Sequence, residues 1–198
     1  MEVNEILRDY VGDLLAVENH CFEAIKRQNG DAEFARYSEV VLLLKKIETT
    51  VKTQLFWLDD FSSSTGGGAK TEIKKAATSL AGAISGVYGK MMREDAVSRS
   101  LRDDYVTLTL IAVNCSMFHT AALALNETSV AEVALKHMNE IVPLVVELGR
   151  IIPSVVTREL AEKHQIVDTS AWMAAAEKSR EAWRNAACER NPDFHPIN

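Results

Sequence analysis

Acidic side chains interrupt the apolar faces of the predicted helices, and they are the residues of this sequence that could most readily bind a metal ion or take part in catalysis. Steps of three and four residues trace the inward seam of a helix in a bundle. The seams within residues 2–28, 31–61, 94–125 and 128–152 each include a carboxylate. An ionised carboxylate in a dry core is costly unless it is paired, protonated or bound to a metal ion. The pattern therefore raises the hypothesis of a shared cation site.

The candidate metal ligands come from all four seams. They are Glu18, Glu48, Asp104, His137 and Glu140. His137 and Glu140 are three residues apart, so a helix places them on one face. Carboxylates and imidazole are the ligands that iron and manganese take in dinuclear bundles. The opposing interpretation is that seam periodicity drifts, so that single acids point between helices toward solvent or a lysine.

Residue counts around the predicted hairpin turns test whether these acids share one depth. Around the first turn, Glu18 lies level with a residue about five positions before Glu48, an offset of about 7 Å at 1.5 Å per residue. Around the second turn, Asp104 lies level with about Arg150, well away from Glu140. Staggered loops absorb the first offset more easily than the second. The counts favour a degenerate site over an intact dinuclear one.

The elements that would position these residues are long helices, and no strand is predicted. Asn29-Gly30 is a good helix stop, and Asp31 can cap the helix that follows. Residues 62–68 read SSSTGGG, a flexible break. Two hairpins joined by a long connection indicate a four-helix bundle with a crossover, in which a weaker helix lies at 70–92. The expected helices are 2–28, 31–61, 70–92, 94–125, 128–152 and 170–190. The helix at 128–152 is expected to be kinked or restarted at Pro143 and again at Pro153.

Composition narrows the class of protein. The chain has 198 residues, 47% of them hydrophobic, with only 9 Gly and 4 Pro, which argues against a sandwich or barrel because short strands need many turns. A net charge of −6 without a basic block argues against nucleic acid as a partner. The three cysteines are far apart and form no CxxC pair, which is typical of reduced thiols in a cytoplasmic protein. The first residues lack the basic start of a signal peptide.

One stretch raises the question of a membrane. Residues 105–126 contain no Asp, Glu, Lys or Arg and are long enough to span a bilayer. They also include three threonines, two asparagines, a serine and a histidine, a polar content that suits a helix buried in protein. We interpret the stretch as the central helix of a soluble core and expect no membrane partner.

Two further features of the sequence bear on function. Cys115, His119 and Asp104 could suggest Cys-His-Asp catalysis, but no loop supplies oxyanion donors. Trp172 and Trp183 are expected to dock the last helix on the bundle or in a dimer interface. We therefore expect a homo-oligomer, a dimer, and no motif identifies a small-molecule substrate. The predicted domains are a bundle at residues 1–168 and a C-terminal helix and tail at 169–198 packed on it.

Several segments together resemble the ferritin-like superfamily, in particular its small bacterial stress-associated branch. The resemblance covers residues 5–159. It rests on LLAVE at 14–18, the neighbourhood of Glu48, RDDY at 102–105, AALAL at 121–125 and HMNE at 137–140. It implies an all-α, ferritin-like four-helix bundle with a crossover helix, to which this chain adds a C-terminal accessory helix.

The departures from that family concern its metal site, which uses Glu-x-x-His on two helices. Three residues after Glu48 comes Val51, and three after Glu140 comes Pro143. We expect a stress-associated bundle whose di-metal site is degenerate or absent, with no cofactor. The alternatives are a di-iron or di-manganese carboxylate protein, acting as an oxidase or in iron handling through the five ligands named above, and a helical interaction module without metal. Whether the protein is an enzyme stays open at this point.

Overall fold

The computed structural model describes residues 3–66 and 96–188, with side chains to 185, and in these ranges the chain is all-α. The helix expected at 70–92, and with it the predicted crossover helix, lies outside the described residues. The other predicted helices are present, with ends within a few residues of those expected, except where described below. The helices are α1 (Val3–Asn29), α2 (Ala32–Ala35), α3 (Ser38–Ser64), α5 (Val97–Ala124), α6 (Thr128–Lys163) and α7 (Ala171–Cys188).

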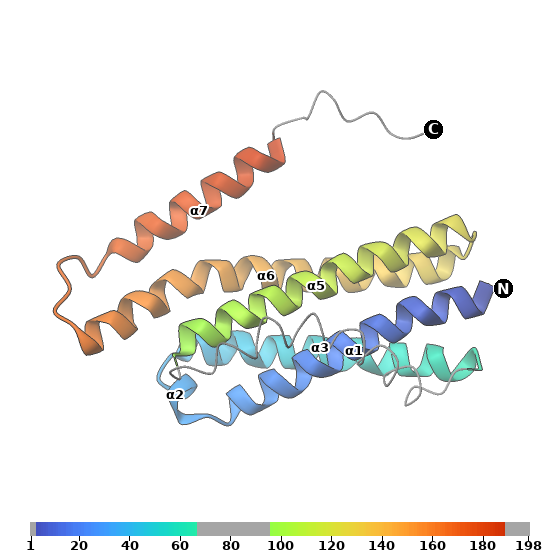
Figure 1. Cartoon of the computed structure of the whole chain (residues 1–198), viewed down its shortest axis with the longest axis horizontal. Coiled ribbons are helices and arrows are strands. Elements are labelled where there is room, and N and C mark those ends of the chain that lie inside the picture. Colours follow the sequence, from blue (N-terminus) through green and yellow to red (C-terminus); the bar gives the residue numbers. More distant parts are fainter. Residues whose placement is uncertain (1–2, 67–95, 189–198) are drawn as a thin grey trace.

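The four long helices pack side by side as two antiparallel hairpins (Figure 1). One hairpin is α1 with α3, the other is α5 with α6, and they meet through contacts of α1 with α5 and of α3 with α6. Helices α3 and α5 run in the same direction, so the end of α3 and the start of α5 lie at opposite ends of the bundle (Figure 1). This agrees with the prediction of two hairpins joined by a long connection. Helix α7 packs on the outer side of α6.

The seams predicted for α1 and α5 are confirmed. On α1, every predicted seam position is buried, including Glu18 and Cys21. On α5, the seam is buried from Val97 to Ala122 and includes Asp104. The stop at Asn29-Gly30 is also where α1 ends. Apolar residues at steps of three and four were sufficient to define both faces.

The second predicted helix is wrong in its first part, because the chain makes a separate short helix before α3. The Asp31 carboxylate accepts the backbone N–H of Glu33 at 2.8 Å and starts α2, as its predicted capping role requires. Phe34 and Tyr37 then anchor the step in the core. The guanidinium of Arg158, on α6, lies 4.3 Å from the centre of the Tyr37 ring.

The short helix α2 changes which residues of α1 and α3 lie at the same depth in the bundle. The Asn29 side chain donates to Glu48 at 2.6 Å, and the Arg8 guanidinium donates to the carbonyl of Thr65 at 2.6 Å. Between these two anchor points, Glu18 lies level with about residue 57 of α3. The prediction that it lies level with a residue before Glu48 was wrong, because it assumed a tight turn after α1.

Helix α6 also differs from its prediction. It continues through Pro143 and Pro153 to Lys163, so neither proline restarts the helix. Proline removes one hydrogen bond of a helix, and packing along a neighbouring helix can hold the axis in place. Here α5 and α3 both pack against α6. The N-cap residue of α6 is Glu127, which makes no side-chain capping bond.

Candidate functional site

Glu18 is a fully buried carboxyl group at the middle of the bundle. Its exposed fraction is 0%, and neither of its oxygens has a hydrogen-bond partner. Burial raises the pKa of Glu18 well above its usual range, and the negative charge of Glu140 on α6 raises it further. Burial therefore favours the protonated form of Glu18, because protonation removes the cost of a buried charge.

Two cysteines and a histidine share this part of the interior, and all three are neutral. Burial, with a smaller effect from Glu18, raises the pKa of Cys115 to about 12, and the pKa of Cys21 is also well above its usual range because of burial. Such thiols are poor nucleophiles. Burial lowers the pKa of His137 to about 4. The His137 ring packs edge-on against Trp57, with 5.5 Å between ring centres, and its Nδ1 has no hydrogen-bond partner.

Asp104 lies at a different depth. Its Oδ1 accepts a hydrogen bond from the Gln28 side chain at 3.1 Å, whereas its Oδ2 has no hydrogen-bond partner. Burial raises the pKa of Asp104 to about 7, although the Gln28 bond acts in the opposite direction. Gln28 is ten residues from Glu18 on α1, which is about 15 Å along the helix axis. Asp104 thus pairs with the end of α1, whereas Glu18 lies further along the same helix, and both acids add to the effect of burial in raising the pKa of Cys21, which lies between these positions.

Glu48 and Glu140 lie at the edges of their helices, so their predicted seam positions were wrong. The inward positions belong to the neighbouring Ile47 and Ile141. Glu48 is half-buried and accepts the bond from Asn29. The side chain of Glu140 is 38% exposed, 3.9 Å from Lys136. It also accepts a hydrogen bond from the Gln54 side chain at 2.9 Å.

A carboxamide from the neighbouring helix is the hydrogen-bond donor to each of three predicted ligands. The pairs are Gln28 with Asp104, Asn29 with Glu48, and Gln54 with Glu140. Within residues 3–66 and 96–185, no three His, Cys, Asp or Glu side chains lie close enough to hold a metal ion. The structure does not bring the five predicted ligands together, and the donor set does not fit a dinuclear metal centre.

The Cys-His-Asp hypothesis also lacks its geometry. The Nδ1 of His119 lies 2.8 Å from the carbonyl oxygen of Ala131, so this ring nitrogen is engaged with the α6 backbone. Cys115 is buried, with a pKa of about 12, and Asp104 is eleven positions away on the same helix. This set has no activated thiolate to act as a nucleophile.

The outward face of α5 is the first of two surface features that can serve binding. Val106, Val113 and Met117 are 46%, 51% and 48% exposed and form one stripe along the helix, which we call the α5 stripe. Every exposed residue of α5 from 106 to 124 is uncharged. By length and composition, α5 is also the one described helix that could cross a membrane. Only 33% of its most apolar window is buried, whereas a helix enclosed by a protein core would be mostly buried. The interpretation of α5 as a helix enclosed by the core was therefore only partly right.

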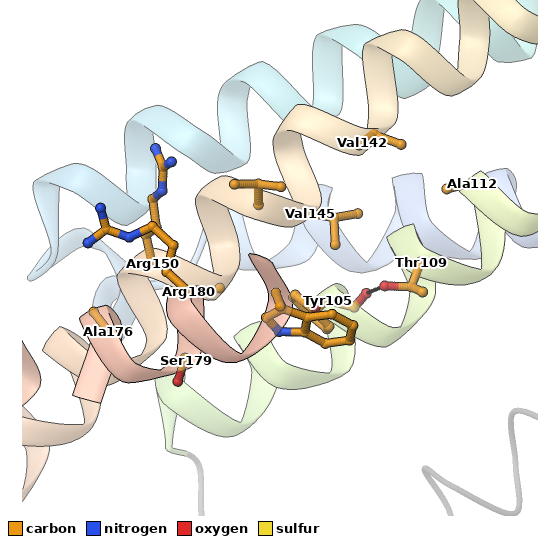
Figure 2. Close-up of a pocket in the computed structure, with 12 residues that line it drawn as sticks. Tyr105, Thr109, Ala112, Val142, Val145, Arg150, Ala176, Ser179 and Arg180 are labelled. Atoms are coloured by element: carbon orange, nitrogen blue, oxygen red, sulfur yellow. Dashed lines mark hydrogen bonds between the residues drawn. The ribbon is translucent and has the colours of Figure 1, made fainter. Parts of the chain in front are cut away.

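The second surface feature is a groove between α5, α6 and α7, which we call the α7 groove. Its volume is about 460 Å³. Valine side chains of α6 and small residues of α5 form its walls, and two arginines lie at one end (Figure 2). The lining residues are Tyr105, Thr109, Ala112, Val142, Val145, Val146, Gly149, Arg150, Ala176, Ser179, Arg180 and Trp183.

Sequence reasoning missed the carboxamide partners and the α7 groove. Gln54 gave a signal, since it lies three residues after Val51 and six after Glu48, at a spacing that puts it near the inward side of the helix. The groove gave none, because it depends on where α7 rests against α6. Comparison of the chain with protein-family models, curated proteins and solved structures finds no match.

Proposed function

We propose that this protein is a ferritin-like helical bundle without a working di-metal site, which acts as a self-associating interaction module through the α5 stripe. The observation that carries the proposal is the uncharged outer face of α5 from residue 106 to residue 124. Exposed apolar residues are common singly, but a contiguous face without charge is typical of an interaction site.

The interior supports a structural role for the acids. Burial raises the pKa of Glu18 and favours its neutral form, and Asp104, Glu48 and Glu140 are each hydrogen-bonded by a carboxamide. A dinuclear centre instead needs several carboxylates that converge at one depth. Glu18 and Asp104 belong to no group of three possible ligands within the described residues, and Glu48 and Glu140 lie at helix edges. The bundle core therefore works as a support for the outer surface.

A second copy of the chain is the partner that fits the α5 stripe best. A two-fold axis places the same patch of both subunits in contact, and the centre of such an interface is depleted in charge. The stripe satisfies this condition, because pairing it with itself buries no Lys, Arg, Asp or Glu. The hydroxyl group of Thr120 on this face donates to a carbonyl of its own helix, so burial leaves this donor satisfied.

Sedimentation velocity on the full chain tests self-association. We expect wild type to sediment as a dimer and Val113→Glu to sediment as a monomer with unchanged helix content, because two charges cannot be buried face to face. Phe56→Glu is the matched control, since Phe56 is 79% exposed on the outer face of α3 and should not affect the dimer. A monomeric wild type that binds phosphatidylcholine vesicles through α5 would contradict the proposal.

The metal-binding alternative has its own test. Equilibrium dialysis against Fe²⁺ or Mn²⁺ is expected to show less than one bound ion per chain. Glu18→Gln and Glu140→Gln should bind the same small amount as wild type. Stoichiometric binding that both substitutions abolish would establish a metal site that assembles on loading, and the degenerate-site proposal would fail.

A further inference from the structure

The α7 groove has an elongated apolar floor. Along α6 its lining runs from Val142 to Arg150, eight residues or about 12 Å of helix. Val145 and Val146 lie between these ends, and Gly149 keeps the floor low where Tyr105 crosses from α5, since a Cβ there would be 3.4 Å from that ring. The volume of about 460 Å³ lies in the range of small-molecule sites.

The charge in the groove is confined to one end. Arg150 of α6 and Arg180 of α7 lie at the same end, whereas Val142 and Ala112 lie at the other (Figure 2). Arg180 forms an ion pair with Glu177 on its own helix. Arg150 has no ion-pair or hydrogen-bond partner within the described residues. The nearby Glu147 is engaged by Lys46 at 2.9 Å on the side of α3.

Trp183 gives the groove its third wall. It lines the groove and is nevertheless 70% exposed, so α7 rests on α6 without covering its own largest apolar side chain. Placing an apolar chain beneath this indole would remove apolar surface of both groups from water and so stabilise the complex. The groove therefore has an apolar lining about 12 Å long, with guanidinium groups at one end.

We propose that the α7 groove binds an anionic amphiphile, a medium-chain fatty-acid carboxylate, with its alkyl chain along α6 and its carboxylate at Arg150. Guanidinium groups bind carboxylates through two parallel N–H donors, and Arg150 is free to do so. A neutral alcohol would lack this contact, and a cationic amphiphile would be repelled by both arginines. The site is separate from the α5 stripe, since Val113 and Met117 do not line it.

Isothermal titration of the full chain with octanoate, decanoate and dodecanoate, below their micelle concentrations, tests the proposal. We expect one ligand per chain, with affinity rising about two- to fourfold per methylene until the groove is filled. Dodecanoate should also shift the tryptophan emission to shorter wavelength as Trp183 becomes covered. Dodecanol should bind about tenfold more weakly, and dodecyltrimethylammonium should not bind.

Two variants and one control locate the site. Arg150→Gln should weaken dodecanoate binding about tenfold and leave dodecanol binding unchanged, because only the head-group contact is lost. Ala112→Phe fills the apolar end and should abolish binding of both ligands. Arg184→Gln, on the same helix as Arg180 but outside the groove, should bind like wild type. Circular dichroism melting checks that each variant is folded.

The outcomes separate this proposal from its competitors. Equal binding of dodecanoate by wild type, Arg150→Gln and Ala112→Phe would overturn it, because binding would then be elsewhere. If no ligand titrates and Ala112→Phe alters the sedimenting mass, the groove holds a second copy and the proposal also fails. Val113→Glu should bind dodecanoate normally even as a monomer, so ligand binding and self-association are tested independently.

Discussion

Helices α3 and α5 are parallel, nearly equal in length and similarly placed in the bundle, but their outer faces differ. The exposed face of α3 carries charge at five positions, Lys45, Lys46, Lys52, Asp59 and Asp60. Its exposed Leu42 and Phe56 lie singly among these charges. The exposed face of α5 from residue 106 to residue 124 carries none. This difference is the basis for the proposal that α5, and not α3, contacts a partner.

The inner faces of the same two helices differ in the opposite sense. Helix α5 buries Asp104, whereas the acid of α3, Glu48, lies at the edge of the helix, and Ile47 takes the inward position. The helix with the uncharged outer face thus holds the buried acid. Burial of the Asp104 carboxylate costs free energy of folding, and Asp104 belongs to no group of three possible metal ligands within the described residues. Substitutions on the two helices can test each part of this contrast.

The largest expected change in the free energy of unfolding comes from comparing the inner and outer faces of α5. Phe118 is fully buried and packs edge-on against Phe61 of α3, with 6.3 Å between ring centres. Phe118→Ala should lower the free energy of unfolding by about 3–5 kcal/mol. Met117→Ala, one residue away on the outer face, should lower it by less than about 1 kcal/mol for the isolated chain. Urea unfolding of both variants at low protein concentration measures this, and equal losses would contradict the assignment of the two faces.

The next effect concerns the buried acid of α5. The folded state raises the pKa of Asp104 from 3.8 to about 7, so the folded protein binds this proton more tightly than the unfolded chain. Its contribution to stability is fully present below about pH 4 and is lost as the pH rises toward 7. Asp104→Asn should therefore raise the free energy of unfolding at pH 8 by on the order of 3 kcal/mol.

Glu48→Gln on α3 is the comparison variant, and it should change the free energy of unfolding at pH 8 by about 1 kcal/mol or less. His137 is a useful second contrast, since its lowered pKa has the opposite consequence. Its contribution is present above about pH 6.5 and is lost as the pH falls toward 4. Urea unfolding at several pH values separates these slopes. A steeper pH dependence in Asp104→Asn than in wild type would contradict the account of that acid.

The smallest effect lies on the charged face of α3. Lys46 and Glu147 form an ion pair at 2.9 Å, with both side chains about half exposed. Lys46→Ala should change the free energy of unfolding by less than about 0.5 kcal/mol relative to Lys52→Ala, a lysine for which no partner is described. Thermal unfolding of the two variants measures the difference. A loss above 2 kcal/mol would mean that the α3 face is part of a tighter network.

The sequence predicted the helical class and two of the four seams. On α1 and α5 the apolar steps are regular, and Glu18 and Asp104 are buried as expected. On α3 the prediction slipped by one residue, from Ile47 to Glu48. The buried residues Leu44, Ile47, Val51, Gln54 and Leu58 follow steps of three and then four, whereas the prediction took four and then three. On α6 the same one-residue slip exchanged Ile141 and Glu140.

The candidate site was less predictable, because it depends on pairings between helices. The depth of Glu18 relative to α3 follows from the bonds made by Asn29 and Arg8, which no periodicity encodes. The carboxamide partners, such as Gln54, look like ordinary polar residues until the facing helix is known. The α7 groove exists because α7 rests on α6 and leaves Trp183 uncovered, a consequence of docking that local patterns do not determine.

Photo-cross-linking at the outer face of α5 tests the central claim most directly. A benzoylphenylalanine placed at position 113 reports what lies against the α5 stripe, and the same group at position 56 reports on the outer face of α3. The account predicts that irradiation at position 113 yields a covalent dimer whose mass is twice that of the chain, whereas position 56 yields only monomer. A dimer from position 56, or none from position 113 at concentrations where the chain sediments as a dimer, would contradict it.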